Sequence, residues 1–338
     1  MDSVKERYSA AAHVREEALC CPVDYDPKFL QVIPQEVLDR DYGCGDPSTY
    51  VRSGETVLDL GAGGGKICFI ASQIVGPDGR VIGIDMNDDM LELSRGAQAT
   101  VAERVGFDNV DFRHGRIQDL KTDLDALDHM LEANPVKNAT EYKELHAKLA
   151  SQSNDRPLVA SDSIDVVVSN CVLNLVSDQE KPSLFQEIFR VLKPGGRVAI
   201  SDIVSDKASP NHLKNDPDLW SGCISGALTE SGFASALTEV GFAGVTLDKL
   251  EQTPWQVVED IECRSATYVA YKPSSEDTAK TEIEVIYTGP WAEVIDETGN
   301  VFHRGARVHV SGETAATLRS GAYAKQFVMF GEPESGCC

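Results

Sequence analysis

Cysteines are the residues of this 338-residue chain with the most versatile chemistry, and three of the nine lie in motifs whose surroundings suggest a functional role. Cys44 lies in YGCGDP, Cys171 in VVVSNCVLNLVSD and Cys223 in WSGCISGALT. Each one alone is more often core filler than functional, because a free cysteine is among the most frequently buried residues. A thiol can also be a nucleophile or a ligand for a soft metal. Since the chain has no C-x-x-C pair, a ligand cluster would have to be assembled from distant segments.

Other cysteines carry weaker signals. Cys68 falls within a predicted helix and Cys263 within a predicted strand, so we interpret both as core filler. The vicinal pair Cys20-Cys21 could capture a thiophilic ligand and pass it inward, or it could be a thiol pair under a flexible entry segment. The sequence leaves both alternatives open. An odd number of cysteines behind a charged, non-secretory start argues against a disulfide framework and favours the cytoplasm.

A second chemical signal is the glycine-rich turn Gly61–Gly65 between a predicted strand and a predicted helix. Glycines let the backbone approach a ligand, and the helix N-terminus offers unpaired N–H groups. Asp59 precedes the turn, where a carboxylate would repel a pyrophosphate but suits a cation such as a sulfonium amino acid. Asp85, at the end of the next strand, can accept both hydroxyls of a ribose. The alternatives are an ordinary strand-end aspartate and a capping aspartate.

These residues must be positioned by strands and helices that alternate along the chain. The sequence predicts strands at 57–60, 81–85, 109–113, 164–169 and 197–203, and helices at 66–75, 88–105 and 184–192. This alternation predicts an α/β fold, a doubly wound Rossmann-like sheet with helices on both faces. Ligands of such sheets bind at the carboxyl ends of the strands. Asp59, Asp85 and Cys171 all fall at such ends.

The residue composition and the predicted secondary structure change along the chain, and these changes predict three parts. We expect an N-terminal helical and irregular cap with Cys44 at 1–52, a main domain at 53–272, and a small, mostly β C-terminal unit at 281–331. The cap should begin with an amphipathic helix over 4–19. The main domain should contain an insertion at about 121–158, made of one or two solvated helices, and a substrate-binding part at about 205–270.

Charge excludes some classes of partner. Lysine and arginine number 31 against 54 acidic residues, which gives a net charge of −23. Nucleic acid and anionic membrane surfaces are therefore poor partners, because gripping phosphates needs clustered basic side chains. The sequence also lacks an apolar run near the ~18 residues that a membrane helix requires. These features predict a soluble cytoplasmic protein.

The motifs VLDLGAGGG, VIGIDM and VLKPGG together resemble the class I S-adenosylmethionine-dependent methyltransferases over about residues 55–205. The resemblance implies that residues 53–272 form the domain that binds this cofactor. It places Met86 against the adenine and Ile117 with Gln118 at the edge of that ring. Gln118 departs from the acidic residue that is more usual there. The cofactor-binding set implied is Asp59, Gly61, Gly63, Gly65, Asp85, Met86, Ile117, Gln118 and Asn170.

The three cysteine motifs narrow the resemblance, because they are similar in order and surroundings to those of arsenite methyltransferases, over about residues 40–245. This implies Cys44, Cys171 and Cys223 as the catalytic ligands of trivalent arsenic, in an enzyme of arsenic detoxification that acts on arsenite and methylarsenite. Departures from the family pattern are the insertion at 121–158, the segment ALCCPVDYDP, and Asp46 where asparagine is more usual. They bear on substrate range and product more than on reaction type.

The implied chemistry is coherent, since arsenic(III) is soft and prefers thiolates to harder ligands. Three sulfurs would hold it as a pyramid whose lone pair stays free to attack a methyl group. The implied co-substrate is a thiol reductant, glutathione or thioredoxin. Two alternatives remain: a methyltransferase for another thiophilic metalloid or a small organic acceptor, and a thiol-rich metalloid-binding protein without turnover. A nicotinamide dehydrogenase would give the cysteine motifs no role.

Overall fold

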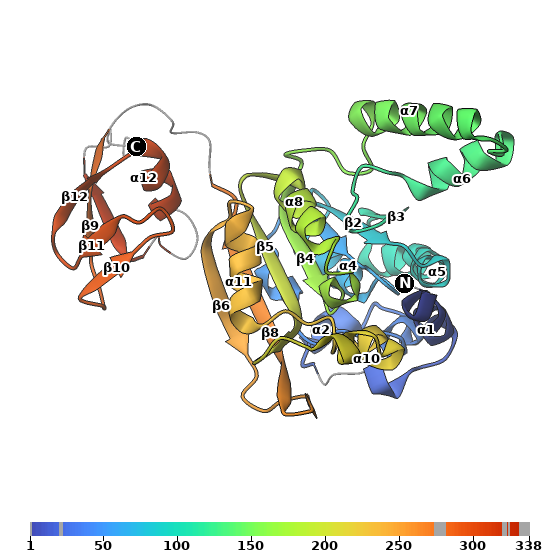
Figure 1. Ribbon diagram of the computed structural model, residues 1–338, viewed down its shortest axis with the longest axis horizontal. Coiled ribbons are helices and arrows are strands. Elements are labelled where there is room, and N and C mark those ends of the chain that lie inside the picture. The colour runs from blue at the N-terminus through green and yellow to red at the C-terminus, as the bar shows by residue number, and fades with distance from the viewer. Residues whose placement is uncertain (1, 20–22, 274–281, 320–322, 324, 331–338) are drawn as a thin grey trace.

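The computed structural model describes residues 2–19, 23–273, 282–319, 323 and 325–330. A large α/β body carries a small β-rich unit at its C-terminal end (Figure 1). The two alternatives for Cys20-Cys21 concern residues outside the described ones.

The body is built on one sheet with the strand order β3-β2-β1-β4-β5-β8-β6, in which β7 pairs with β8. Strands β1 to β5 are parallel, whereas β8 is antiparallel to β5, β6 and β7. The order reverses between β1 and β4, the point at which open α/β sheets bind ligands. The strands are β1 Thr56–Leu60, β2 Arg80–Asp85, β3 Val110–His114, β4 Ile164–Asn170, β5 Leu192–Ser205, β6 Ala243–Leu250, β7 Gln256–Val258 and β8 Ile261–Tyr271.

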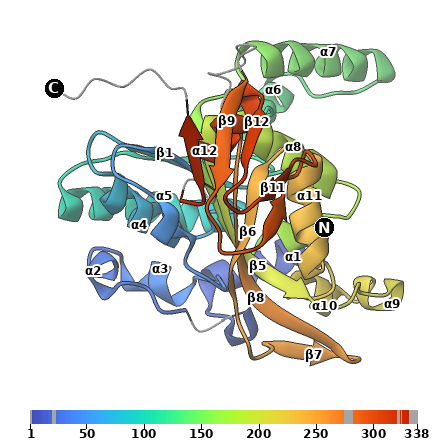
Figure 2. The ribbon, with the colours of Figure 1, turned by 90° about the vertical axis from the view of Figure 1, so that its left-hand side faces the viewer.

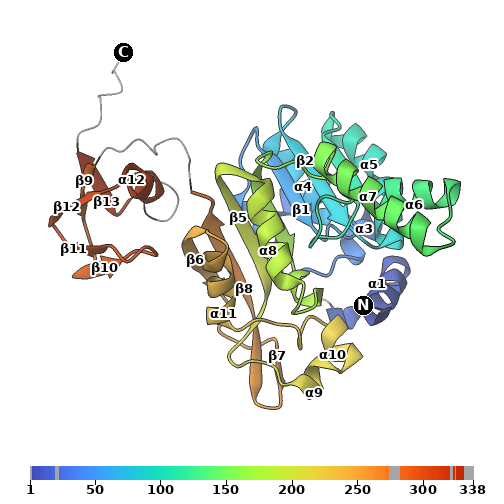
Figure 3. The same cartoon turned by 45° about the horizontal axis from the view of Figure 1, so that its top comes forward.

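Helices cover both faces of this sheet, which confirms the doubly wound α/β class (Figures 1 and 3). The helices of the body are α1 Asp2–His13, α2 Pro27–Leu30, α3 Gln35–Asp39, α4 Lys66–Val75, α5 Asp88–Val105, α6 Leu124–Ala133, α7 Ala139–Asp155, α8 Lys181–Val191, α9 Asn211–Lys214, α10 Pro217–Ser221 and α11 Glu230–Glu239. Short 3-10 turns lie at η1 Glu17–Leu19, η2 Pro47–Tyr50 and η3 Leu173–Leu175.

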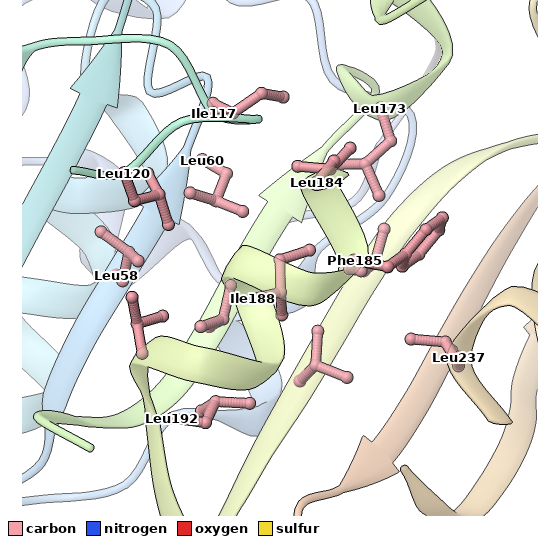
Figure 4. Close-up of a cluster of buried hydrophobic side chains, with 14 of the residues drawn as sticks. Leu58, Leu60, Ile117, Leu120, Leu173, Leu184, Phe185, Ile188, Leu192 and Leu237 are labelled. Atoms are coloured by element: carbon pink, nitrogen blue, oxygen red, sulfur yellow. The ribbon is translucent and has the colours of Figure 1, made fainter. Parts of the chain in front are cut away.

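Two apolar cores lie on opposite faces of the sheet because side chains alternate along each strand. Leu58 and Leu60 belong to the core that contains Ile188 of α8 and extends to Leu237 of α11 (Figure 4). Val57, the residue before Leu58, points to the other face and packs with residues of α4 and α5. Burial on both faces explains the continuous apolar runs that made these strands predictable.

The N-terminal helix is shorter than the sequence predicts, and the prediction of one helix over 4–19 is wrong. Helix α1 ends at His13, and a separate turn follows at η1. The hydroxyl of Tyr42 donates to the carbonyl of Ala11 and accepts from the amide of Glu16. The Tyr42 hydroxyl, which lies outside the helix, thus occupies a backbone carbonyl and a backbone amide that a longer helix would have paired within itself.

The insertion predicted at about 121–158 forms two helices, α6 and α7, that stand off the body (Figures 1 and 3). Asp125 of α6 ties them to the body, since its carboxylate pairs with Arg95 on α5 and with His114 at the end of β3. The side chains of α7 that the structure describes are exposed or half-buried. This agrees with the prediction of a solvated insertion.

The C-terminal unit contains two small antiparallel sheets, which confirms its predicted β character (Figure 2). One sheet has the order β12-β9-β13, and the other pairs β10 with β11. Its elements are β9 Ile283–Tyr287, β10 Glu293–Ile295, β11 Val301–His303, β12 Arg307–Val310, α12 Gly312–Arg319 and β13 Phe327–Phe330. The unit meets the body at β6, where the amide of Gly244 donates to Glu297 and to the Tyr323 hydroxyl.

Among the described residues, no helix combines the length and the apolar character that crossing a membrane requires.

Candidate active site

A large cavity opens at the carboxyl ends of β1 to β4, at the reversal of strand order. It encloses about 1150 Å³, including open solvent at its mouth. Its wall contains eight of the nine residues that the sequence assigned to cofactor binding. These are Asp59, Gly61, Gly63, Asp85, Met86, Ile117, Gln118 and Asn170.

Gly65, the ninth, stands apart from this wall. It caps α4 with a positive φ of 88°, and a Cβ there would lie 2.7 Å from the ring of Phe112. The structure therefore gives Gly65 a packing reason, the close approach of helix and sheet.

Two carboxylates, the buried Asp59 and the half-buried Asp85, form the polar centre of the cavity. Asp85 accepts hydrogen bonds from the backbone N–H groups of Gly63 at 2.8 Å and Asn87 at 2.9 Å, which fix its orientation. Asp59 accepts one from the thiol of Cys68 at 3.2 Å, so Cys68 touches the site and is more than core filler. Burial raises the pKa of Asp59 to about 7 and also raises the pKa of Asp85. Such groups favour a ligand that brings positive charge and hydroxyl donors.

A third carboxylate, Glu180, lies in the cavity wall beside Gln118. Gln118 occupies the position at which an acidic residue is more usual in the family that the sequence resembles. Its Oε1 pairs with the Arg116 guanidinium at 2.6 Å. Sequence reasoning missed Glu180 because it precedes α8, far along the chain from Gln118. The fold brings it to the cavity through η3 and the loop after it.

The three motif cysteines lie together next to this cavity. Cys44, Cys171 and Cys223 are all free, all buried, and all members of one apolar cluster that also contains Ile203 and Leu213. The thiol of Cys223 donates to the carbonyl of Cys171 at 3.2 Å. Hydrogen bonds with Cys223 and Cys44, together with burial, raise the pKa of Cys171, and burial raises that of Cys44. These raised pKa values favour the neutral thiol form.

The backbone at two of these cysteines is strained. Cys171 has a φ of 64° and Cys223 a φ of 62°, the left-handed region that residues with a Cβ seldom adopt. Such conformations cost on the order of 1 kcal/mol or more and cluster at functional sites, where the surrounding structure enforces them.

Cys171 joins the thiol cluster to the cavity, because it lines the cavity as well. Helix α1 forms a second connection between the thiol cluster and the cavity. Tyr8 lines the cavity, and its hydroxyl lies 3.8 Å from the Cys223 sulfur. A guanidinium nitrogen of Arg7 donates to the carbonyl of Asp218, in the helix before Cys223. Sequence reasoning missed Tyr8, since one tyrosine on an amphipathic helix is indistinguishable from a packing residue.

In the part of the chain that the structure describes, no group of three or more His, Cys, Asp or Glu side chains is arranged as a metal-ion site. The Cys171 thiol nevertheless has both other thiols within hydrogen-bonding reach.

The cavity fits S-adenosylmethionine, the cofactor that the resemblance implies. The carboxylates of Asp59 and Asp85 suit its positive charges and its ribose hydroxyls. Met86 and Ile117 offer apolar contacts for an adenine ring. The fit rests on the polar and apolar groups that line the cavity.

Comparison with known proteins agrees with this geometry. A family model for a methyltransferase domain matches residues 51–255, and one for a domain of unknown function (DUF8838) matches residues 275–336. An arsenite methyltransferase of Aquipseudomonas alcaligenes is 33% identical over 341 residues, covering 93% of this chain and 85% of that protein. The arsenite methyltransferase of Mus musculus is 32% identical over 319 residues, covering 90% and 74% of the two chains.

A solved structure extends the similarity to the whole fold. An arsenic(III) S-adenosylmethionine methyltransferase from Chlamydomonas reinhardtii matches with a TM-score of 0.62 and 26% identity, over 92% of this chain and 97% of that one. Since these relatives align over most of both chains, and the cavity adjoins a cluster of the three motif cysteines, this chain belongs to the arsenite methyltransferase family of S-adenosylmethionine-dependent enzymes.

Proposed function

We propose that this protein transfers methyl groups from S-adenosylmethionine to trivalent arsenic held by Cys44, Cys171 and Cys223, with arsenite and methylarsenite as substrates. The observation that carries the proposal is the meeting of three free, buried thiols, from segments far apart in the sequence, at the wall of the cofactor cavity. A soft, thiophilic centre is the ligand that such a thiol set selects.

The cofactor would be held mainly by the carboxylates at the strand ends. Asp85 is oriented by two backbone N–H groups and keeps lone pairs for the ribose hydroxyls. Asp59 supplies negative charge for the cationic part. When bound, S-adenosylmethionine supplies a methyl group on a sulfonium sulfur, an electrophile that the lone pair of thiolate-bound arsenic can attack.

The thiols would load arsenic by exchange. Arsenite exists near neutral pH as the hydroxide As(OH)₃, so each neutral thiol forms one As–S bond while its proton leaves with one hydroxide as water. Three thiols release three waters, and no external base is needed. The raised pKa values of Cys171 and Cys44 keep these protons in place until exchange. The protein then contributes positioning, which can lower a barrier by several kcal/mol.

A reductant completes the proposal. Methylation through the lone pair formally oxidises arsenic from the trivalent to the pentavalent state, so two electrons must return it before a second methylation. A small thiol or a dithiol protein, such as glutathione or thioredoxin, supplies those electrons. Such reductants, and the free thiols of this site, are typical of the cytoplasm.

The direct test is incubation of the full chain with arsenite, S-adenosylmethionine and glutathione, followed by separation and quantification of arsenic species. We expect methylated arsenic to accumulate in proportion to S-adenosylhomocysteine. Arsenic that binds but is never methylated would instead identify a metalloid-binding protein. Methylation of a different acceptor in place of arsenite would overturn the substrate assignment.

The cofactor assignment has its own test in Asp85→Ala. Loss of a charged hydrogen-bond acceptor should weaken S-adenosylmethionine binding by about 1.5–3 kcal/mol, as titration calorimetry would measure. Asp111→Ala, on the neighbouring strand β3 and paired with Arg80 and Arg113, is the matched control and should bind normally. Equal affinity in Asp85→Ala and the control would show that Asp85 is misassigned.

A further inference from the structure

The segment from Asn170 to Asn174 carries Cys171 between two asparagines, and each asparagine contacts a different neighbouring loop. We propose that Asn170 and Asn174 are the positioning residues of the two outer thiols. In this view Asn170 holds Cys44, Asn174 holds Cys223, and one short segment assembles the arsenic site. The inference rests on the proposed function and goes beyond it by assigning these two amides.

The side-chain amide of Asn170 forms hydrogen bonds with the loop that carries Cys44. Its Oδ1 accepts from the backbone N–H groups of Cys44 at 2.9 Å and Gly45 at 3.1 Å. Its Nδ2 donates to the carbonyl of Gly45 at 2.7 Å and to the Tyr25 hydroxyl at 3.1 Å. The resemblance assigned Asn170 to cofactor binding, and the residue does line the cavity. Its hydrogen bonds, however, go to the Cys44 loop.

The sequence around Cys44 is adapted to this contact. A Cβ at Gly43 would lie 2.0 Å from Nδ2 of Asn170, so any other residue there would push the amide away. The Cys44 carbonyl is held from the opposite side by the hydroxyl of Ser265 at 2.6 Å. Cys44 therefore belongs to a loop that the chain clamps from two sides, through residues remote in sequence.

Asn174 makes the corresponding contact with the other outer cysteine. It is fully buried, and its Nδ2 donates to the carbonyl of Cys223 at 3.2 Å and to that of Ile203 at 2.6 Å. The Cys223 carbonyl belongs to a residue with a left-handed backbone, so this hydrogen bond helps to hold a strained conformation. A Cβ at Gly226 would lie 2.1 Å from the Asn174 carbonyl oxygen, so this loop too needs a glycine in order to approach.

Asn174 also carries a cost that packing alone would not justify. Within the described residues its Oδ1 is buried without a hydrogen-bond partner. An unsatisfied buried acceptor destabilises a fold by about 1–3 kcal/mol. An apolar residue of similar size would remove that unpaired acceptor but would also take the donor from the carbonyls of Cys223 and Ile203. Violations of this kind are expected at functional sites, where the side chain has another task.

The two asparagines should affect the two substrates differently. Arsenite needs three protein sulfurs, whereas methylarsenite already carries one carbon ligand and needs two. Releasing Cys44 in Asn170→Ala should lower kcat/KM for arsenite at least about tenfold and that for methylarsenite less than about threefold. Asn174→Ala releases Cys223, which both substrates use, and should lower both values at least about tenfold.

Aspartate variants separate the acceptor from the donor. Asn170→Asp keeps the acceptor oxygen for the amides of Cys44 and Gly45 and should recover most of the arsenite activity. Asn174→Asp loses the donor to the Cys223 carbonyl and should behave like Asn174→Ala. The matched control is Asn109→Ala, because the half-buried Asn109 amide ties Gly76 and Ser72 together away from the site. It should cost stability with equal effect on both substrates.

Binding measurements provide a readout besides activity. X-ray absorption of arsenite-loaded protein should count three As–S bonds in the full-length native chain and two in Asn170→Ala. Calorimetry should give Asn170→Ala the same S-adenosylmethionine affinity as the native chain, within about twofold. Weakened cofactor binding with equal losses on both arsenic substrates would instead make Asn170 a cofactor contact and overturn the inference.

The inference and the proposed function fail in distinguishable ways. If the native chain neither methylates arsenite nor shows three As–S bonds, the proposed function fails. If the native chain does both and Asn170→Ala matches Asn109→Ala, the inference alone is wrong. Circular dichroism and thermal unfolding confirm that each variant is folded. Should Asn174→Ala fail to fold, the Asn170 variants decide the question.

Discussion

The roles of the three cysteines can be distinguished experimentally, because arsenite needs three protein sulfurs and methylarsenite needs two. Serine at Cys171 or Cys223 offers a hard, protonated oxygen that soft arsenic binds poorly, so both arsenite and methylarsenite activity should be lost. Cys44→Ser should lose arsenite activity and keep methylarsenite activity. Cys263→Ser, in the same apolar cluster but on β8, is the control and should cost stability alone. Speciation assays on both substrates measure the result. Full arsenite activity in Cys171→Ser would end the three-thiolate hypothesis.

Asp59 should make cofactor binding and stability depend on pH in opposite directions. Burial raises its pKa from 3.8 to about 7. Its contribution to the free energy of unfolding is therefore fully present below pH 3.8 and is lost as the pH rises through about 7. S-adenosylmethionine affinity should rise over the same interval, because the cationic cofactor prefers the ionised carboxylate.

The variant Asp59→Asn tests both directions. Without cofactor, its stability should fall less than that of the native chain between pH 5 and pH 8, as chemical denaturation at each pH would measure. Its cofactor affinity should be weak and nearly independent of pH. A native chain whose cofactor affinity is flat across pH 7 would show that Asp59 does not sense the cofactor charge.

At the scale of elements, Asn87 couples a helix cap to the docking of α1. Its Oδ1 caps α5 by accepting from the amides of Asp89 and Met90, while its Nδ2 donates to the Lys5 carbonyl and to the hydroxyl of Ser9. Asn87→Ala should cost about 1 kcal/mol of stability through the lost cap. Since α1 lines the cavity, the KM for S-adenosylmethionine should also rise.

Asn87→Asp separates the two effects, because aspartate keeps the cap and loses the donor to α1. Thermal unfolding should then return close to the native value while the KM stays raised. A native KM in both variants would mean that the cavity does not depend on how α1 is docked.

The elements show why part of this molecule could be predicted from sequence. Strands β1 and β2 and the turn Gly61–Gly65 follow local rules, namely apolar runs, glycine and end-of-strand aspartates, so the cavity position could be predicted. The presence of Tyr8 and Glu180 in the cavity wall, and the hydrogen bonds of Asn170, could not be predicted. Each depends on which distant segment the fold brings alongside, and local pattern does not encode that. Likewise, antiparallel β8 between β5 and β6 is a matter of long-range pairing.

At the scale of the whole molecule, the C-terminal unit is separable from cofactor binding. It meets the body at Gly244 on β6, whereas the cavity lies at the ends of β1 to β4. Deletion of residues 281–338 should therefore leave S-adenosylmethionine affinity within about twofold of the native value by calorimetry. A folded truncation that no longer binds the cofactor would show that this unit closes the site.

The contact at Gly244 has a consequence for solubility. Strand β6 is the last strand of its sheet, and such an edge presents unpaired backbone groups on which another chain can add a strand. Irregular register in its pairing with β8 and the charges of Asp248 and Lys249 make the exposed end a poor template. The C-terminal unit occupies the buried beginning, through Glu297 and Tyr323. A chain without this unit would retain its chemistry but expose a sheet edge on which a second copy can pair. Its apparent molar mass by light scattering should therefore grow with protein concentration, whereas that of the native chain should stay constant.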